Sequence, residues 1–313
     1  MDDDVLGSVL APLRLHGAYY SDWRLHPGWA VRGRPEPRAL MHYMFTGSAV
    51  VTCQDGLSHT LASGDLAMFP RGAAHIVSGE QCDTAPYISD LLPERLPGAS
   101  AVLSLGNVAA DPVGRMLCAG LDYDPSAAQL LYQLLPDVLI VRARQLAGQQ
   151  MLQHLLAGIL DESDRPGAGA ETVQLRAFEL AYVLGLRLAL ATTDTVLGRA
   201  IRNPRLAPAL VAINTRFGQS WTVPTLAGLT EMSESTFTRE FTATVGARPA
   251  AYLRARRLLE TKRLLADTAL PLEQISTAVG YTSTVGLHQA FVRECRVTPG
   301  EFRARRRAAR ADR

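Results

Sequence analysis

An internal repeat between Ser220 and Arg303 constrains this chain more than any other feature of its sequence. A pattern of apolar, glycine and proline positions that begins at Leu226 returns at Ile275, with an offset of 49 residues before the turn and 50 residues after it. Self-similarity at a fixed period indicates repeated structural units. The one-residue difference falls at a turn between two helices, so we predict two helix-turn-helix units, at residues 222–242 and 271–292.

The first unit carries its own start and stop signals. Thr222 and Ser233 are predicted N-caps, because their side-chain oxygens can accept a hydrogen bond from a free backbone N–H in the first helical turn. Phe237 and Phe241 have the four-residue spacing of a packed helix face, and Gly246 can supply the left-handed conformation that ends a helix. The outward face of this second helix carries Glu234, Ser235, Thr238 and Arg239.

A connector helix is predicted from Pro249 to about Ala266. It spans about 25 Å, enough to hold two recognition helices in successive turns of a DNA major groove. We expect it to pack with Ala251, Ala255, Leu258, Leu259 and Leu265, and to expose Arg254, Arg256, Arg257, Lys262 and Arg263. The second unit has a turn at Gly280-Tyr281 and a helix from Ser283 to about Cys295, with Thr284, Val285, His288 and Gln289 outward.

Residues 220–303 resemble the DNA-binding domain of the AraC/XylS family of bacterial transcription regulators. The resemblance is carried by Trp221-Thr222, Leu226-Ala227, Met232-Ser233, Phe237 to Phe241, Gly246, Pro249, Tyr252-Leu253, Gly280-Tyr281, Ser283, Phe291 and Pro299 to Arg303. It implies that bases or phosphates face Ser235, Thr238 and Arg239 in the first unit, and Thr284, His288 and Gln289 in the second. The predicted DNA-binding set also includes Glu234, Val285, Arg254 and Arg293.

The second unit departs from the family pattern. Arg296 stands where the family usually has Gly, so a non-Gly residue adopts the left-handed conformation at a cost of roughly 1 kcal/mol, or the helix ends differently. Gly286 lies inside the recognition helix, at a cost of about 1 kcal/mol relative to Ala. Gln289 replaces a common Arg, while Leu287 replaces a Phe and Cys295 an aromatic residue. We therefore expect the second unit to read DNA more loosely.

Charge divides the 313 residues unevenly. Residues 1–203 hold 15 basic and 21 acidic residues, whereas residues 204–313 hold 17 basic and 9 acidic residues, a net charge of +8. A basic region that coincides with the repeat indicates a polyanionic partner. The alternative interpretation is a basic tail that is only solvated. With 47% hydrophobic residues, we expect more than one core. We predict domains at 1–124, 125–202 and 203–313, with the last boundary at Asn203-Pro204.

The sequence contains no predicted signal peptide or membrane span, because its start is acidic and its most apolar segment, Leu175 to Ala191, is interrupted by charges. We expect a cytoplasmic protein. The cysteines are Cys53, Cys82, Cys118 and Cys295, and none has the C-x-x-C spacing of a zinc site.

Short apolar runs between about Leu13 and Tyr123 predict an all-β sandwich or barrel. The expected strands are Ala39 to Thr46, Ala49 to Cys53, Leu66 to Phe69, His75 to Val77 and Leu117 to Tyr123. The segment Gly64 to His75 resembles the second cupin motif, which would let His75 point into the barrel. The overall fold class is therefore α+β, with a cupin-like β-barrel followed by helices and an all-α domain with two helix-turn-helix units.

Cupins are often metalloenzymes, but their first motif supplies a His-x-His pair and a Glu, and the matching strand here has only His42. Two histidines, with His59 a distant third, make a poor metal site, so we predict no metal or other cofactor and no catalytic residues. His42 and His75 are instead expected in an effector pocket, with Trp23 and His26. The segment Ser21 to Gly28 is read as a turn anchored by Trp23, or as the mouth of that pocket.

Helical spacing follows, over residues 129–141, 145–162 and 171–197, with a loop from Arg165 to Ala170. Because the sequence links these helices to neither the barrel nor the DNA reader, we predict that they form the seam of a homodimer.

The preferred function is a sequence-specific transcription regulator whose N-terminal part senses an effector. Its partners would be double-stranded DNA, an unidentified small molecule or oxidant, and RNA polymerase if it activates. Two alternatives stay open: a cupin metalloenzyme with an accessory basic domain, and an oxidant sensor that uses Cys82 and Cys118.

Overall fold

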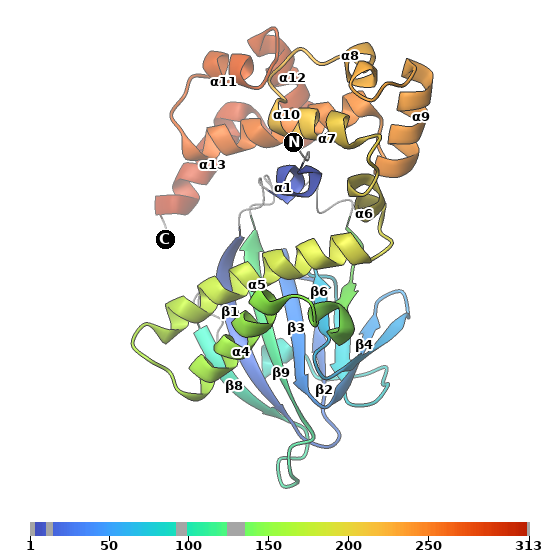
Figure 1. The fold of residues 1–313 in the computed structure, drawn as a ribbon. Helices are drawn as coiled ribbons and strands as arrows, with labels where there is room; N and C mark the ends of the chain where they lie inside the picture. Colours follow the sequence, from blue (N-terminus) through green and yellow to red (C-terminus); the bar gives the residue numbers. More distant parts are fainter. Residues whose placement is uncertain (1–3, 11–14, 92–98, 124–134, 312–313) are drawn as a thin grey trace. The chain divides into compact units, whose positions relative to one another are not determined.

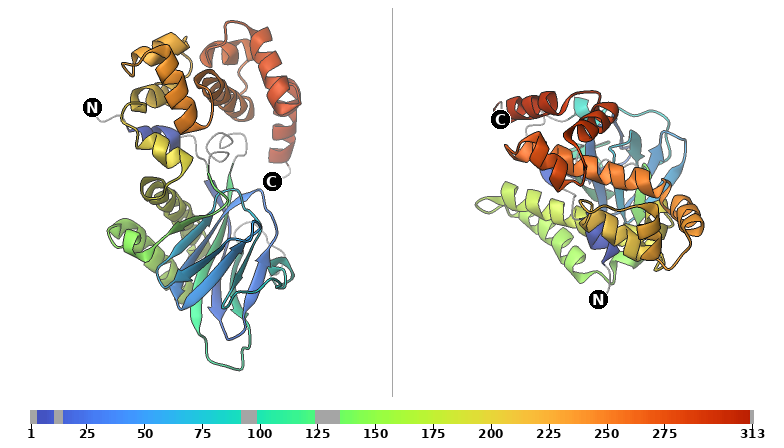
Figure 2. Two further views of the ribbon diagram at one scale, coloured as in Figure 1. Left: turned by 90° about the vertical axis from the view of Figure 1, so that its right-hand side faces the viewer. Right: turned by 90° about the horizontal axis from the view of Figure 1, so that it is seen from above.

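The computed structural model describes residues 4–10, 15–91, 99–123 and 135–311. The chain divides into two compact units, which Figures 1 and 2 show as a sheet-rich and a helical part. The sheet unit comprises Leu15–Tyr123 and Leu135–Asp194; the helical unit comprises Met1–Arg14, Asp124–Leu134 and Thr195–Arg313. These boundaries differ from the predicted ones, because most of the predicted region 125–202 joins the sheet unit and the N-terminal helix joins the helical unit.

Two sheets build the sheet unit. The larger has the strand order β10-β6-β3-β9-β1-β8 and the smaller the order β2-β7-β4-β5, with β1 and β8 parallel and every other pair antiparallel. The strands are β1 Leu15–Leu25, β2 Ala30–Gly33, β3 Arg38–Thr46, β4 Ser48–Cys53, β5 Ser58–Ala62, β6 Leu66–Phe69, β7 His75–Ser78, β8 Ala99–Leu105, β9 Gly114–Tyr123 and β10 Leu139–Val141.

One apolar core joins the two sheets. It contains Trp23, Met44 and Phe69 from the larger sheet and Val51 and Val77 from the smaller one. Alternate residues of a strand point to opposite faces, so each sheet presents one apolar face to this core. The five predicted strands are confirmed, and the β-rich N-terminal fold with them.

Strand β1 corrects the prediction for Ser21 to Gly28. Residues 21–25 continue an 11-residue strand, paired with β9 on one side and β8 on the other. The Trp23 indole is 4% exposed and donates a 2.8 Å hydrogen bond to Ser21 Oγ. The charged residues Asp22 and Arg24 fit a strand as well, because alternation places them on the face of β1 opposite the core side chain of Trp23.

Helices α3 (Ala143–Leu146), α4 (Gln150–Asp164) and α5 (Ala170–Thr192) follow the strands, and a loop at 165–169 separates the last two as predicted. The predicted helix over 129–141 is wrong at its end, because residues 139–141 form β10 and pair with β6; residues 129–134 lie outside the described part. Helix α5 also ends earlier than predicted, and Val196–Ile201 forms a separate helix, α6.

Helix α5 packs directly on the larger sheet, so the expectation that these helices do not touch the barrel is wrong (Figure 1). The approach is close because both partners use glycine. A Cβ atom on Gly17 of β1 would lie 2.8 Å from the Leu175 side chain, and one on Gly185 would lie 2.9 Å from Leu66. Sequence periodicity identified an apolar helix but not the surface that it covers.

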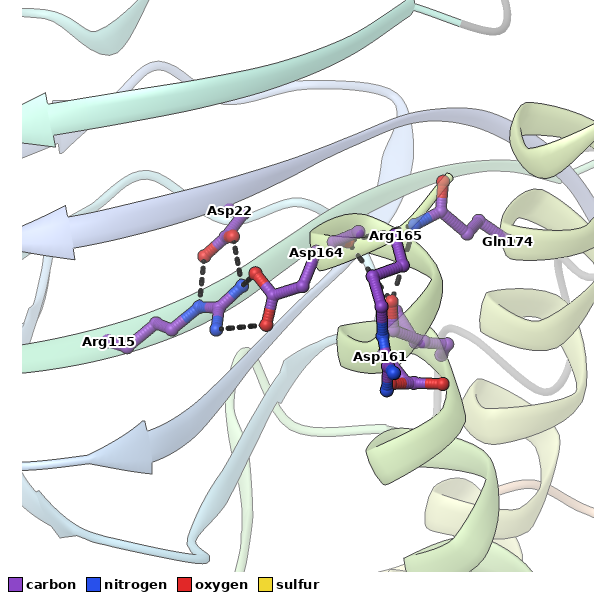
Figure 3. A network of polar contacts seen from close by, with 8 residues as sticks. Asp22, Arg115, Asp161, Asp164, Arg165 and Gln174 are labelled. Carbon is purple, nitrogen blue, oxygen red and sulfur yellow. Dashed lines mark hydrogen bonds and ion pairs between the residues drawn. The ribbon is translucent and has the colours of Figure 1, made fainter. Parts of the chain in front are cut away.

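A polar network ties helix α4 to the same sheet (Figure 3). Arg115 of β9 donates to both oxygens of Asp22, at 2.9 and 2.5 Å, and to both oxygens of Asp164, at 3.0 and 2.8 Å. Asp22 is only 2% exposed, and this pairing compensates the cost of burying its charge. The guanidinium therefore connects two strands with the last turn of α4.

The helical unit contains α1 (Val5–Leu10), α6, α7 (Ala207–Thr215) and the two predicted helix-turn-helix units, and α1 packs on α7. The first unit is α8 (Val223–Gly228) and α9 (Glu234–Val245), followed by the connector α10 (Pro249–Asp267). The second is α11 (Leu272–Ala278) and α12 (Thr284–Cys295), followed by α13 (Pro299–Ala311). No helix in the described ranges is long and apolar enough to cross a membrane.

The predicted helix ends are confirmed. The side chains of Thr222, Ser233 and Ser283 each accept a hydrogen bond from a backbone N–H three residues on. Gly246 ends α9 with φ 77°, and Arg296 ends α12 with φ 59°, both in the left-handed region. Short-range capping chemistry therefore defines these helices as the sequence indicated.

Two charges of the connector are buried, against expectation. Arg256 is 6% exposed, pairs with Glu260 at 3.2 Å and lies 4.2 Å from the centre of the Phe217 ring; burial lowers its pKa. Lys262 is 8% exposed. Ala251, predicted to pack, is exposed instead. The connector packs on more than one side, and its apolar stripe did not reveal this.

Candidate functional site

The predicted DNA-binding residues of α9 and α12 lie on the outward sides of their helices. Glu234, Ser235, Arg239, Val285 and Gln289 are exposed, and Thr238, Thr284 and His288 are half-buried. The opposite sides carry Phe237, Phe241, Leu287 and Phe291, all fully buried. A helix anchored along one side in this way can present its other side to a major groove. That these residues contact DNA stays a prediction.

A groove of about 310 Å³ lies between α8, α10 and α12. It brings the two remaining predicted residues, Arg254 of α10 and Arg293 of α12, into one lining, with Thr222 and Tyr281. Arg257 also lines the groove, but it donates to the backbone oxygens of Phe217 and Gln219, at 2.9 and 2.7 Å, and is therefore structural.

The arginines near the groove and on the two recognition helices differ in their partners. Arg256 and Arg263 are paired with Glu260, at 3.2 and 2.5 Å. Among the described residues, no carboxylate pairs with Arg239, Arg254 or Arg293, and all three are exposed. The guanidinium groups on α9 and beside the groove are therefore among those available to a phosphate.

A narrow, mostly apolar cavity lies in the sheet unit. Its volume of about 30 Å³ has room for roughly two water molecules. Its walls come from both sheets and include Tyr19, Ser21, Trp23, Val31, Gly33, Glu36, Leu40, His42, His75, Val77, Ile88, Cys118 and Ala119. His42 of β3, His75 of β7 and Cys118 of β9 form a continuous chain of hydrogen bonds.

The contacts fix the protons of this chain. His75 Nδ1 lies 2.7 Å from the Ala73 carbonyl oxygen, which can only accept, so Nδ1 carries the hydrogen. In neutral His75 the Nε2 atom must then accept the hydrogen bond from His42 Nε2, at 2.9 Å. His42 Nδ1 in turn accepts from the Cys118 thiol, at 2.9 Å. All bonds of the chain thus run in one direction, from thiol to carbonyl.

Burial keeps the chain neutral. It lowers the pKa of His75 to about 4 and that of His42 well below its ordinary value, and it raises the pKa of the Cys118 thiol. Both nitrogens of each histidine are engaged, so neither imidazole offers a free lone pair to a metal. Among the described residues, no group of three His, Cys, Asp or Glu side chains could hold a metal ion. This arrangement does not fit the metal centre of a cupin enzyme.

The predicted effector-pocket residues are only partly brought together. Trp23, His42 and His75 line the cavity, whereas His26 does not. His26 directly follows β1, and its Nδ1 lies 2.8 Å from the carbonyl oxygen of Ala110, in the segment between β8 and β9. Cys118 lines the cavity; Cys82 does not, and it is half-buried in the loop after β7. Ser21 lies in the segment that the sequence analysis gave as a possible pocket mouth, whereas sequence reasoning missed Tyr19 and Glu36, although alternation along β1 would have placed Tyr19 on the face of Trp23.

Known protein families match both the sheet-rich and the helical part of this chain. A family model described as "Cupin" matches residues 4–191, and one described as "Helix-turn-helix domain" matches residues 226–305. The HTH-type transcriptional regulator AlkR of Acinetobacter baylyi is 27% identical over 303 residues, covering 96% of this chain and 99% of its own. The RCS-specific HTH-type transcriptional activator RclR of Escherichia coli is 24% identical, covering 91% and 89%.

The DNA-binding domain of AdpA, solved with a target DNA, is 30% identical, and the match covers 34% of this chain and 96% of that one, with a TM-score of 0.33.

A β-rich domain with an inner cavity and a tandem helix-turn-helix domain together define a ligand-sensing, DNA-binding transcription regulator. The chain belongs to the AraC/XylS family, in the group that carries a cupin domain at its N-terminal side.

Proposed function

We propose that α9 and α12 read two neighbouring major-groove segments of one operator. Arg239, Thr238 and Ser235 contact base edges in the first segment, and His288 and Gln289 do so in the second. Arg254 and Arg293 hold phosphates of the backbone between the two segments. The observation that carries this proposal is that Arg239, Arg254 and Arg293 are exposed and pair with no carboxylate in the described part of the chain, beside two capped, well-packed helices.

The test is selection of bound fragments from random and genomic DNA by the full-length protein at a stated salt concentration. We expect a bipartite site with two short elements about 10 base pairs apart. A single element would mean that α12 holds only the backbone. Binding without enrichment, lost uniformly as salt rises, would overturn the proposal.

We also propose that the cavity in the sheet unit receives the effector and that the protein has no enzymatic activity of its own. The site has apolar walls and a few fixed polar groups, which is typical of small-molecule pockets. The engaged histidines argue against catalysis by a bound metal. The protein would act in the cytoplasm, where its DNA lies, and an activator would also contact RNA polymerase.

An oxidant is the second candidate signal, because the Cys118 thiol faces both the cavity and His42. The raised pKa of Cys118 opposes this reading, since the thiolate is the reactive form. A Cys82→Ser/Cys118→Ser protein that still responds fully to oxidant would eliminate it.

We propose that α4 and α5 form the homodimer seam. Met151, Val173 and Leu180 are apolar and exposed on these helices, at 58%, 56% and 38%. Charge introduced there should weaken association, because an unpaired charge at an apolar interface is costly. Sedimentation of Leu180→Arg/Val173→Glu protein as an unchanged dimer would place the seam elsewhere.

A further inference from the structure

The narrow cavity and a separate open cleft meet at two residues of the sheet unit. The cleft has a volume of about 640 Å³, and its lining includes Arg32, Arg34, Thr52, Gln54, Asp83 and Tyr87. Gly33 and His75 line both the cleft and the cavity. They are register partners on β2 and β7, so they lie side by side at the ends of the two strands. The Gly33 backbone and the His75 imidazole ring therefore border both spaces.

The absence of a side chain at Gly33 leaves space beside the His75 ring. A Cβ atom built there would lie 3.4 Å from His75 Cε1, in van der Waals contact, and 3.7 Å from both ring nitrogens. The backbone of Gly33 is not in the left-handed region, so no conformational demand requires glycine at this position. The functional consequence of glycine here is the space beside the ring.

The cleft favours an anion. The Arg34 guanidinium lies 4.0 Å from the centre of the Tyr87 ring and is exposed, and no carboxylate among the described residues pairs with it. Stacking on a ring leaves the N–H edge of a guanidinium free for the two oxygens of a carboxylate. Arg32 is engaged, since it donates to the Asp83 carbonyl oxygen at 2.7 Å. Asp83 is the one acidic residue in the described lining, against two arginines.

The cavity favours an apolar group. Its histidines and Cys118 satisfy one another in the one-directional chain. Glu36, its acidic residue, accepts from the Tyr19 hydroxyl at 3.4 Å and lies 3.9 Å from Arg38. A polar ligand atom placed against the histidines or Cys118 would have to break one of the bonds of that chain. Trp23, Leu40 and Ile88 supply apolar contact, and the 30 Å³ of space fits the end of an alkyl chain or ring.

We propose that the cleft and the cavity form one two-part site for a small carboxylate with a short apolar tail, the carboxylate on Arg34 and the tail passing Gly33 and His75. This inference rests on the proposed role of the cavity as effector site and names the chemical class of that effector. Each methylene that enters the cavity should tighten binding about fourfold, until the space is filled.

The test is a calorimetric titration of the full-length protein with acetate, butyrate and hexanoate, and with hexan-1-ol as an uncharged probe. We expect affinity to rise with chain length among the carboxylates, and hexan-1-ol to bind at least about tenfold more weakly than hexanoate, since it lacks the charge-assisted bonds. Equal affinity for all three carboxylates, or no binding by any, would overturn the proposal.

Two variants separate the two parts of the site. Arg34→Gln should lower the affinity of every carboxylate, hexanoate by about tenfold or more, and leave hexan-1-ol unchanged. Gly33→Ala fills the space beside His75, so it should abolish the gain from acetate to hexanoate while acetate binding persists. The matched controls are Arg144→Gln, an exposed arginine of α3, and Gly158→Ala, a glycine of α4 with open space around it. An effect of either control as large as that of its partner would also overturn the proposal.

Operator binding by the same samples distinguishes the two levels of inference. Selective DNA binding with no carboxylate binding would refute this site and leave the regulator function intact. Carboxylate binding with the expected pattern, in a protein that selects no DNA sequence, would support this site and refute the proposed operator reading.

Discussion

Helices α9 and α12 end in the same left-handed backbone conformation, but on Gly246 in one case and Arg296 in the other. Their cores also correspond, because Phe241 meets Tyr252 edge to face at 5.7 Å and Phe291 meets Phe302 at 5.5 Å, each pair 50 residues from its counterpart. The N-terminal caps differ, since Thr222 caps α8 with its side chain, whereas Pro271, at the equivalent position, has no capping atom before α11.

The comparison of the two helix-turn-helix units shows which positions of the repeat tolerate substitution. The packed aromatic pair and the serine caps of the recognition helices are kept, while the ends and the exposed faces vary. Arg239 of the first unit corresponds to Gln289 of the second, and Thr236 to Gly286. A core position is held by its neighbours on all sides, whereas a terminus or an exposed face can change at a cost of about 1 kcal/mol.

The largest test of this equivalence removes the buried rings. Phe241→Ala and Phe291→Ala should each destabilise the helical unit by about 3–5 kcal/mol, because both side chains are fully buried. Denaturant unfolding of the full-length protein, followed by helical circular dichroism, measures this. Val285→Ala, at a side chain that is 64% exposed, is the control. Losses that differ by more than about 2 kcal/mol between the two rings would show that the two cores are not equivalent.

Unlike the two cores, the exposed faces of α9 and α12 should not be equivalent. Arg239→Ala should weaken operator binding by about 1–3 kcal/mol and relax the base preference in one element only, with no change in unfolding. Gln289→Ala should cost less, since α12 also contains Gly286, a residue of low helix propensity. Titrations of operator and scrambled DNA at one salt concentration separate base reading from phosphate contact. An equal loss on both DNAs would assign Arg239 to the backbone.

The caps allow a finer test. Ser233→Ala and Ser283→Ala should each cost about 1 kcal/mol, because each removes one hydrogen bond to a backbone N–H, at 3.3 and 3.1 Å. Thr222→Ala should cost a similar amount, whereas Pro271→Ala has no cap to lose. The free energies of unfolding of the four variants, compared with that of the unaltered protein, measure these losses. A Pro271→Ala loss as large as that of Thr222→Ala would mean that the proline stabilises α11 in another way.

The smallest expected effect concerns the helix ends. Arg296→Gly should stabilise the protein by about 0.5–1 kcal/mol, since it relieves a side chain held at φ 59°. Gly246→Ala should destabilise it by about 1 kcal/mol for the same reason. The denaturant midpoint reports both changes. Stabilisation by Gly246→Ala, or loss by Arg296→Gly, would contradict the account of these two ends.

The sequence by itself determined the local features of the helical unit. Thr222, Ser233 and Ser283 cap helices, Gly246 ends α9, and Phe241 is core. Each of these roles depends on atoms within a few residues of chain or on a simple period, so spacing is enough to predict it. The tandem arrangement followed from the repeat for the same reason.

Only the tertiary structure decided what depends on distant segments. Arg256 and Lys262 are buried because α10 has neighbours on several sides, and Trp23 belongs to a strand because β8 and β9 flank it. His42, His75 and Cys118 form one chain although 33 and 76 residues separate them, and His26 is held elsewhere. Burial and hydrogen-bond partners are set by which elements pack together, and a single sequence carries no direct signal of that choice.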